Sequence, residues 1–288
     1  GPSYLVNLSV QMAQAGQSVA VGFNWFTISS TILLCAGSMF VMWLGERITD
    51  RGIGNGISFI ILIGIIARFP AALVQEFSSR LNEGGGLMLF ILEIIILLFV
   101  FAFAILLVQG TRRIPVQYAK RMVGNKQYGG VRQYIPLKVN SANVMPIIFA
   151  QAIMFIPIAL AGFSNAESAS AFTRAFMDND GFWYNAVFAL LIIVFTYFYT
   201  AIIINPVQMA ENLKLNNGFI PGVKPGKKTA EYIDSIMTRL TLPGSCLLAI
   251  IAILPAFARL FGVSMSFAQF FGGTSLLIMV GVILDTLQ

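Results

Sequence analysis

A glycine-rich segment, residues 45–58, is the first place in this 288-residue chain where a ligand could meet the backbone. Gly52, Gly54 and Gly56 alternate around Asn55, and glycines so spaced allow positive φ angles and close backbone packing. A phosphate-binding loop needs a lysine or a preceding strand, and this segment has neither. The composition therefore favours a tight re-entry turn at the start of a helix over a nucleotide site.

A second segment, residues 110–140, is strongly basic and contains no acidic residue. Three tyrosines, Tyr118, Tyr128 and Tyr134, are interleaved with its charges. Two interpretations stay open: a solvated loop of ordinary positive charge, or a surface that docks on RNA or on an acidic protein groove. Its basic residues are Arg112, Arg113, Lys120, Arg121, Lys126, Arg132 and Lys138.

A third segment follows directly and combines polar amides with prolines. At about 100° per residue, Asn140, Asn143 and Gln151 fall within about 80° of one another on a helical wheel. Pro146 and Pro157 interrupt the hydrogen bonding of the same helix. Polar amides are costly in lipid, so this face should turn toward water or another helix. It is either a movable wall or ordinary contact between helices.

Several other chemistries are excluded or weakened. The chain has no histidine, which removes Ser-His-Asp catalysis, imidazole metal sites and histidine proton relays. Cys35 and Cys246 lie in apolar stretches and are interpreted as small hydrophobic residues, not as a disulfide or metal pair. Two acids, Glu93 and Asp285, fall inside apolar stretches; a proton relay is possible, but structural pairing or placement at a boundary is favoured. We expect no cofactor and no metal.

These segments must be positioned by membrane helices. Mean hydropathy is +0.82 and only 10% of residues are charged, against about 25% in a soluble domain. Spans of about 20 apolar residues suit a hydrocarbon layer of ~30 Å. The second span contains Arg68, which must reach outward or face the bundle. We predict an all-α, polytopic membrane helix bundle with seven spans, at residues 26–44, 57–75, 88–108, 141–161, 183–205, 237–257 and 272–288.

Charge fixes the orientation of the spans. Of the 18 lysines and arginines, 14 lie in three loops on one side, which the positive-inside rule identifies as cytoplasmic. The remaining four, Arg68, Arg80, Arg174 and Arg259, fall at or near the opposite ends. Residues 1–25 are polar without a basic signal-peptide region and are interpreted as an external loop. Because the chain stops directly after an apolar run, we expect it to be part of a longer protein.

Several motifs resemble the SecY family of bacterial protein translocases, and together they cover nearly the whole chain. The segment from Trp43 to Ser58 resembles the region before that family's fifth helix. Further similar segments follow in the family's order: Arg112–Ile114 with Tyr118–Arg121, Leu137–Asn140, Pro146–Phe149, Asn205–Pro206, Ala210–Lys214, Pro221–Gly226, Tyr232–Asp234, Thr238–Thr241 and Phe271–Ile278.

The resemblance implies a ten-helix fold of which this chain supplies helices four to ten. Residues 1–87 would be an external segment and the last two helices of the N-terminal half. Residues 88–288 would be the five-helix C-terminal half, with cytoplasmic basic loops at 109–140 and 206–236. The first three helices, with the family's plug and one side of its lateral gate, are not in this sequence.

By resemblance, the function is that of a protein-conducting channel, which moves unfolded secretory proteins across the bacterial inner membrane and inserts apolar segments laterally into lipid. The family's pore narrows at an apolar ring, carried here by Ile57, Ile61, Ile148 and Ile278. Asn140, Asn143 and Gln151 would belong to the lateral gate. A channel breaks no covalent bond, so we expect no enzyme. The alternatives are a secondary solute transporter, which needs coupling acids at the midplane, and an intramembrane hydrolase, whose constellation is not evident.

The resemblance also implies partners: the SecE and SecG subunits, the SecA motor ATPase or the ribosome with its rRNA, signal peptides and nascent chains, and anionic lipid. SecA or the ribosome would dock on the two basic loops. Lys224 departs from the family, which usually has arginine there, and lysine lacks the planar fork for bidentate contacts. The candidate docking residues are Arg112, Arg113, Lys120, Arg121, Lys126, Lys224, Lys227 and Lys228.

Overall fold

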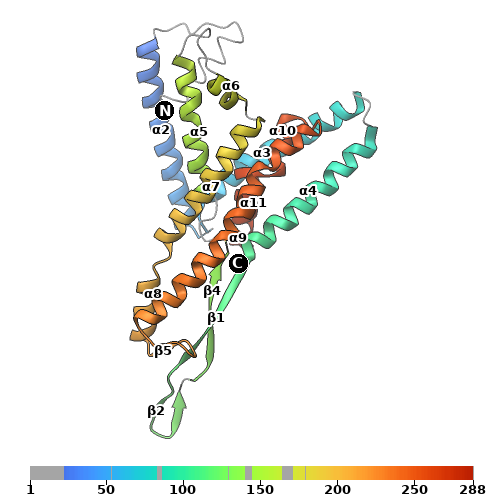
Figure 1. Ribbon diagram of the computed structural model, residues 1–288. Coiled ribbons are helices and arrows are strands. Elements are labelled where there is room, and N and C mark those ends of the chain that lie inside the picture. Colours follow the sequence, from blue (N-terminus) through green and yellow to red (C-terminus); the bar gives the residue numbers. More distant parts are fainter. Residues whose placement is uncertain are drawn as a thin grey trace.

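The computed structural model describes residues 23–52, 54–82, 86–128, 130–139, 145–163, 171–178 and 180–287. Most of this part of the chain is helical, and short strands occupy the side that carries the basic segments (Figure 1). The elements are α2 (Phe23–Asp50), α3 (Gly56–Asn82), α4 (Gly86–Gln109), β1 (Thr111–Tyr118), β2 (Arg121–Val123), β3 (Lys126–Tyr128), β4 (Arg132–Lys138), α5 (Met145–Phe163), α6 (Ala171–Met177), α7 (Phe182–Ile203), α8 (Pro206–Leu215), β5 (Gly218–Phe219), α9 (Lys227–Leu260), α10 (Met265–Ala268), the 3-10 helix η2 (Gln269–Phe271) and α11 (Gly273–Leu287).

The predicted membrane bundle is confirmed, and the count of seven spans is approximate. Five of the described segments are apolar helices long enough to cross a membrane: α2, α3, α4, α7 with α8, and α9. A bent pair, in which residues 265–271 meet α11 at 50°, makes a sixth span if its two parts cross together. The remaining predicted span, residues 141–161, corresponds to α5. Its apolar part, Met145–Pro157, is shorter than a full span.

Three helices extend well beyond their predicted bounds. The first, α2, was expected to end at residue 44 but continues to Asp50. We expected α3 to end at residue 75, but it continues to Asn82, because Glu76 and Arg80 pair at i,i+4 and carry the helix through its polar end. The last long helix was expected from residue 237, yet α9 begins at Lys227. Its first ten residues are amphipathic and bury Ile233 and Ile236 outside the bundle, a contact that hydropathy does not report.

The two basic segments, expected as loops, are folded. In the first, β1 and β4 form an antiparallel hairpin that pairs Thr111 with Lys138 and Gln117 with Arg132. A smaller hairpin of β2 and β3 lies at its far end. The second segment contains α8, β5 and the start of α9, and β5 completes a three-stranded sheet in the order β4-β1-β5.

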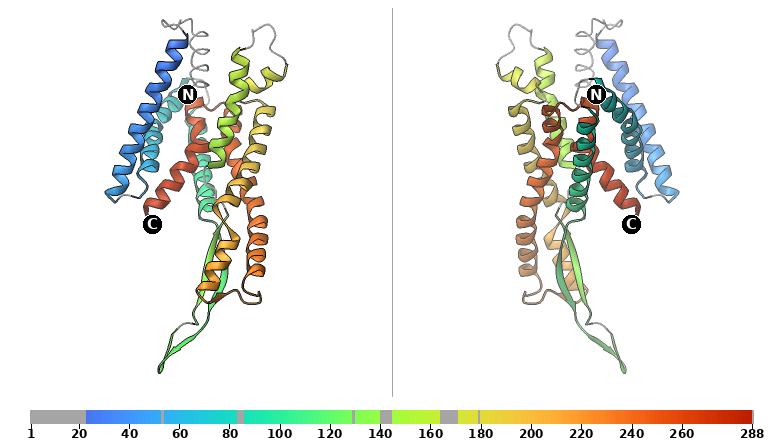
Figure 2. Two further views of the ribbon diagram at one scale, coloured as in Figure 1. Left: turned by 90° about the vertical axis from the view of Figure 1, so that its left-hand side faces the viewer. Right: turned by 90° about the vertical axis from the view of Figure 1, so that its right-hand side faces the viewer.

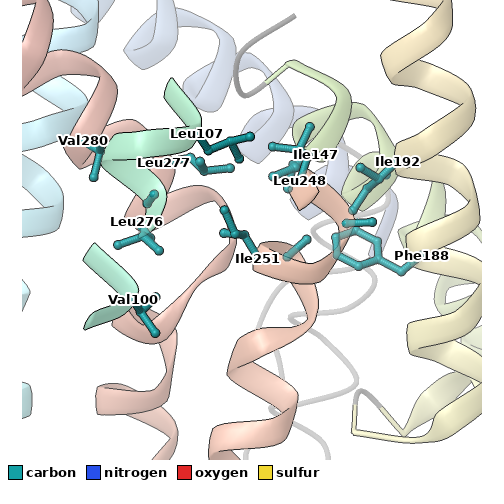
Figure 3. Packing of buried hydrophobic residues seen from close by; sticks show 14 of the residues in the cluster. Val100, Leu107, Ile147, Phe188, Ile192, Leu248, Ile251, Leu276, Leu277 and Val280 are labelled. Carbon is teal, nitrogen blue, oxygen red and sulfur yellow. The ribbon is translucent and has the colours of Figure 1, made fainter. Parts of the chain in front are cut away.

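The helices pack around two apolar clusters. One joins α4, α5, α7, α9 and α11, and Figure 3 shows Leu107, Ile147, Leu248 and Leu277 pointing toward one another within it. The other joins α3, α4, the end of α9, η2 and α11 around Phe267. Figure 2 shows α2 lying at the side of the bundle, where it packs against α3.

Candidate functional site

The two basic segments are joined into one unit. Tyr118 of β1 pairs with Gly218 of β5, and the amide of Ala119 donates to the carbonyl of Asn217 at 3.1 Å. A side chain at position 218 would be crowded, because a Cβ there would lie 3.0 Å from the Tyr118 ring. We call β1–β4, α8, β5 and residues 216–237 the basic platform. The sequence predicts both halves as docking loops but does not show that they share a sheet.

The basic platform has a hydrophobic core of its own. Along β1, Ile114 and Val116 are 2% and 1% exposed and alternate with exposed Arg113 and Pro115, as the period of two in a strand requires. Arg112 lies on the same face as Ile114 but is exposed near the start of the strand. The buried side faces α8 and the first turns of α9, where Ile233 is fully buried. The alternation therefore turns Arg113 away from the helices and packs Ile114 and Val116 against them.

The predicted docking residues occupy two regions of this platform. Arg112, Arg113, Lys120 and Lys126 are exposed on or beside the hairpins; Arg121 begins β2, and its side chain is outside the described set. Lys224, Lys227 and Lys228 are exposed at the start of α9. The Lys224 carbonyl accepts a hydrogen bond from Thr229 Oγ1 at 2.9 Å, so the turn that carries these lysines is fixed. Figure 1 places β2 farther from the bundle than β5.

The glycine-rich segment is a tight junction between α2 and α3, as the sequence favoured. Thr49 Oγ1 donates to the Gly45 carbonyl at 3.0 Å and accepts from the Gly56 amide at 2.9 Å. A Cβ on Gly56 would lie 2.1 Å from the Gly45 carbonyl oxygen, and one on Gly45 would lie 2.5 Å from Ile57 Cγ1. Because Gly45 and Gly56 lack side chains, the two helices can approach closely, and this fixes the position of Ile57 in the first turn of α3.

The four isoleucines of the predicted ring lie on three helices that are neighbours. Ile57, Ile61 and Ile148 are between 38% and 44% exposed, and Ile278 is half-buried. The α11 helix, which carries Ile278, packs against α3 in one cluster and against α5 in the other. It therefore lies between the two helices that carry the other three isoleucines. The ring itself stays a prediction.

Of the predicted gate residues, Gln151 is the one that the described part of the chain includes, and its gate role stays a prediction. It is exposed on α5 and lines a cleft of about 360 Å³ with Tyr184, Gln269 and Thr274. An ion pair between Arg259 Nη1 and Asp180 Oδ2, 2.7 Å apart, borders the same cleft. Asn140 and Asn143 lie outside the described residues.

An ion cluster on the opposite side of the membrane brings together three residues that the sequence did not associate. Arg80 Nε donates to Glu76 Oε1 at 3.1 Å, and Arg80 Nη2 donates to Glu93 Oε1. The amide of Ser264 donates to Glu76 Oε2 at 2.9 Å. Structural pairing of Glu93 is therefore confirmed. The i,i+4 spacing of Glu76 and Arg80 was the only available signal, and Glu76 had been placed in a loop. The side chain of Asp285 is outside the described set.

Comparisons with a family model and with individual proteins identify the same family. The family model described as SecY matches residues 3–287. Proteins named protein translocase subunit SecY are 45% identical over 276 residues in Streptomyces galbus, 43% over 273 in Thermotoga maritima and 47% over 264 in Halalkalibacterium halodurans. These alignments cover 95%, 94% and 89% of this chain. The chain spans 62%, 61% and 61% of those relatives' lengths.

Two solved structures share the fold. One is described as a protein-conducting channel and the other as a SecY protein whose plug domain stabilises the closed state. Both have a TM-score of 0.63, at 18% and 17% identity, and both alignments cover 98% of this chain. They cover 68% and 69% of the solved chains. The comparisons do not support the solute-transporter alternative.

Proposed function

We propose, on the premise that this chain belongs to the SecY family, that it forms the greater part of a channel for unfolded secretory polypeptides. It is a multi-pass protein of the bacterial inner membrane. The channel conducts polypeptides outward and releases apolar segments sideways into lipid. The observation that carries this proposal is the match of the family model across residues 3–287, which takes in every described span and the whole basic platform.

In this proposal Ile57, Ile61, Ile148 and Ile278 form the seal. Branched apolar side chains offer water and ions no hydrogen bonds, so a constriction lined by them dewets and blocks conduction. Apolar contact is also non-directional, so the same ring fits around a passing chain of any sequence. The exposure of three of the four residues is compatible with a lining position.

Arg68 supports a watery environment for the isoleucine face of α3. It is exposed and lies only about 20° around the helix from Ile61. At a rise of 1.5 Å per residue it is about 18 Å from the start of a 27-residue helix, close to the middle of the bilayer. No carboxylate of the described residues forms a salt bridge with it. A charge facing lipid at that depth costs roughly 3 kcal/mol, so a conduit is the favoured neighbour.

The α5 helix would be the movable side of the lateral gate. Gln151 gives it a polar face, and Pro157 removes one hydrogen bond of the helix and so permits bending. An emerging segment of about 20 apolar residues gains more in lipid than in a wet pore, so it leaves through the gate. A polar segment has no such gain and continues outward.

Energy for movement would come from a partner, because a channel of this kind breaks no bond. The basic platform is suited to receive an acidic protein or rRNA, because its apolar core fixes the sheet that carries the exposed Arg112 and Arg113. SecA or the ribosome would bind there, and SecE and SecG would complete the membrane complex. Lys224 would contribute charge without the bidentate geometry of arginine.

Ion conductance tests the seal. Replacing Ile148 or Ile278 by serine should raise the leak of the reconstituted complex in planar bilayers and weaken discrimination between signal sequences. Ile156→Ser is the matched control, because Ile156 is exposed on α5 about 80° around the helix from Ile148. Unchanged conductance in both ring variants would count decisively against the ring. A crosslink from position 148 to a stalled secretory chain would place the chain in the conduit directly.

Salt-dependent binding tests the platform. The double variant Arg112→Gln, Arg113→Gln should weaken binding of the motor or ribosome and flatten its dependence on salt, while the free energy of unfolding stays within about 0.5 kcal/mol. Arg174→Gln removes an exposed charge on the opposite side and should leave binding unchanged. Equal losses in both variants would mean that overall charge, not the platform, governs binding.

A further inference from the structure

A cavity opens between α4 and the end of α9, on the side of the membrane opposite the basic platform. Its volume is about 350 Å³, and its lining is mostly apolar, including Leu92, Ile96 and Phe257. These three side chains are 50%, 45% and 54% exposed, so the cavity opens on the apolar surface of this chain. Two polar residues, Arg80 and Glu93, line the same cavity.

The charges around this cavity do not balance. Glu76 is fully engaged, because one carboxylate oxygen accepts from Arg80 and the other from the Ser264 amide. Glu93 also accepts from Arg80 through Oε1, but its Oε2 is buried with no hydrogen-bond partner among the described residues. When both glutamates are ionised, the single arginine leaves one negative charge in excess. Glu93 is only 8% exposed, and an unpaired carboxylate oxygen so far from water is costly.

We propose that this cavity binds a phospholipid with a primary ammonium headgroup. The ammonium supplies the missing positive charge and donates a hydrogen bond to Glu93 Oε2. The Arg80 guanidinium can donate to the lipid phosphate, since arginine binds phosphate in a planar fork. An acyl chain then covers Leu92, Ile96 and Phe257.

The size and position of the cavity favour a lipid over a partner helix. Glu93 is seven residues from the start of α4, about 10 Å along its axis, and so lies within the outer leaflet. A partner helix is a rigid cylinder about 10 Å across, whereas lipid conforms to an irregular apolar recess. A flexible acyl chain is thinner and is present wherever the protein is embedded.

Lipid exchange tests the proposal without reference to channel activity. The delipidated complex is titrated with phosphatidylethanolamine or with phosphatidylcholine of the same acyl chains, which keeps the phosphate but has no N–H donor. Bound lipid is counted by native mass spectrometry. The wild type should retain phosphatidylethanolamine roughly tenfold better, the value of one hydrogen bond to a charged group. Glu93→Gln should abolish this preference, and Glu211→Gln, on exposed α8, should keep it.

A second variant keeps the test valid if Glu93→Gln fails to fold. Ile96→Trp fills the cavity and should lower retention of both lipids while leaving Glu93 in place. Equal retention of the two lipids by the wild type, or an unchanged preference in Glu93→Gln, would overturn the proposal. So would a crosslink from Glu93 to a lysine of another membrane polypeptide, which would assign the cavity to a protein partner.

Discussion

Two apolar helices of this chain, α2 and α9, have similar hydropathy and very different surroundings. Their most apolar windows have mean hydropathies of 1.7 and 2.1. Within the described structure, 6% of that window is buried in α2 and 39% in α9. Hydropathy therefore indicates that both can cross a membrane, but it does not indicate which of them other helices surround.

Small residues account for much of this difference. A Cβ on Gly244 of α9 would lie 2.3 Å from the Val139 carbonyl oxygen, and one on Gly272 would lie 2.2 Å from the Ile251 carbonyl oxygen. By contrast, a Cβ on Gly37 of α2 would meet no atom of the described residues within 4 Å. Backbone contact at glycine is how membrane helices approach closely, because hydrocarbon provides no hydrophobic force between them.

The largest expected effect comes from truncating matched isoleucines in the two helices. Ile251 of α9 is fully buried, and Ile32 of α2 is 62% exposed. Ile251→Ala should lower the free energy of unfolding by about 2–5 kcal/mol, because a cavity remains in the packed cluster. Ile32→Ala should change it by much less. Unfolding of the purified complex, followed by intrinsic fluorescence, measures both, and equal losses would show that α2 is as tightly packed as α9.

A smaller effect is expected from adding a methyl group at matched glycines. Gly272→Ala forces the end of α9 away from the following turn and should cost about 1–3 kcal/mol. Gly37→Ala should be neutral or stabilise by up to about 1 kcal/mol, because alanine is the better helix former. The difference in Tm between the two variants checks this prediction. A stable Gly272→Ala protein would mean that the close approach is not required.

The smallest expected effect comes from removing side-chain hydrogen bonds at two positions of α2. Thr49→Val removes two hydrogen bonds at the junction with α3 and should cost about 1 kcal/mol. Ser38→Ala removes only an exposed bond to the Leu34 carbonyl, within the helix, and should cost almost nothing. Because Thr49 sets the start of α3, its variant should also raise ion leak through displacement of Ile57. If the ion leak of Thr49→Val equals that of Ser38→Ala, the junction between α2 and α3 does not control the seal.

Much of the architecture could be predicted from particular residues. The apolar run from Met88 to Val108 predicted α4 to within two residues at its start and one at its end, because nothing but hydropathy decides a helix of that composition. The junction at residues 45–58 followed from alternating glycines. Long-range pairing could not be predicted. The contact of β1 with β5 joins residues about a hundred positions apart, and nothing in either segment indicates that it pairs with the other.

The amino-acid sequence alone determined that the chain is a polytopic helix bundle, and it predicts which side faces the cytoplasm, because hydropathy and charge act on each segment separately. Only the tertiary structure decided that the two basic segments share one sheet and that Arg80 holds Glu76 and Glu93 together. Those contacts depend on the relative position of distant elements, which is set by packing in three dimensions.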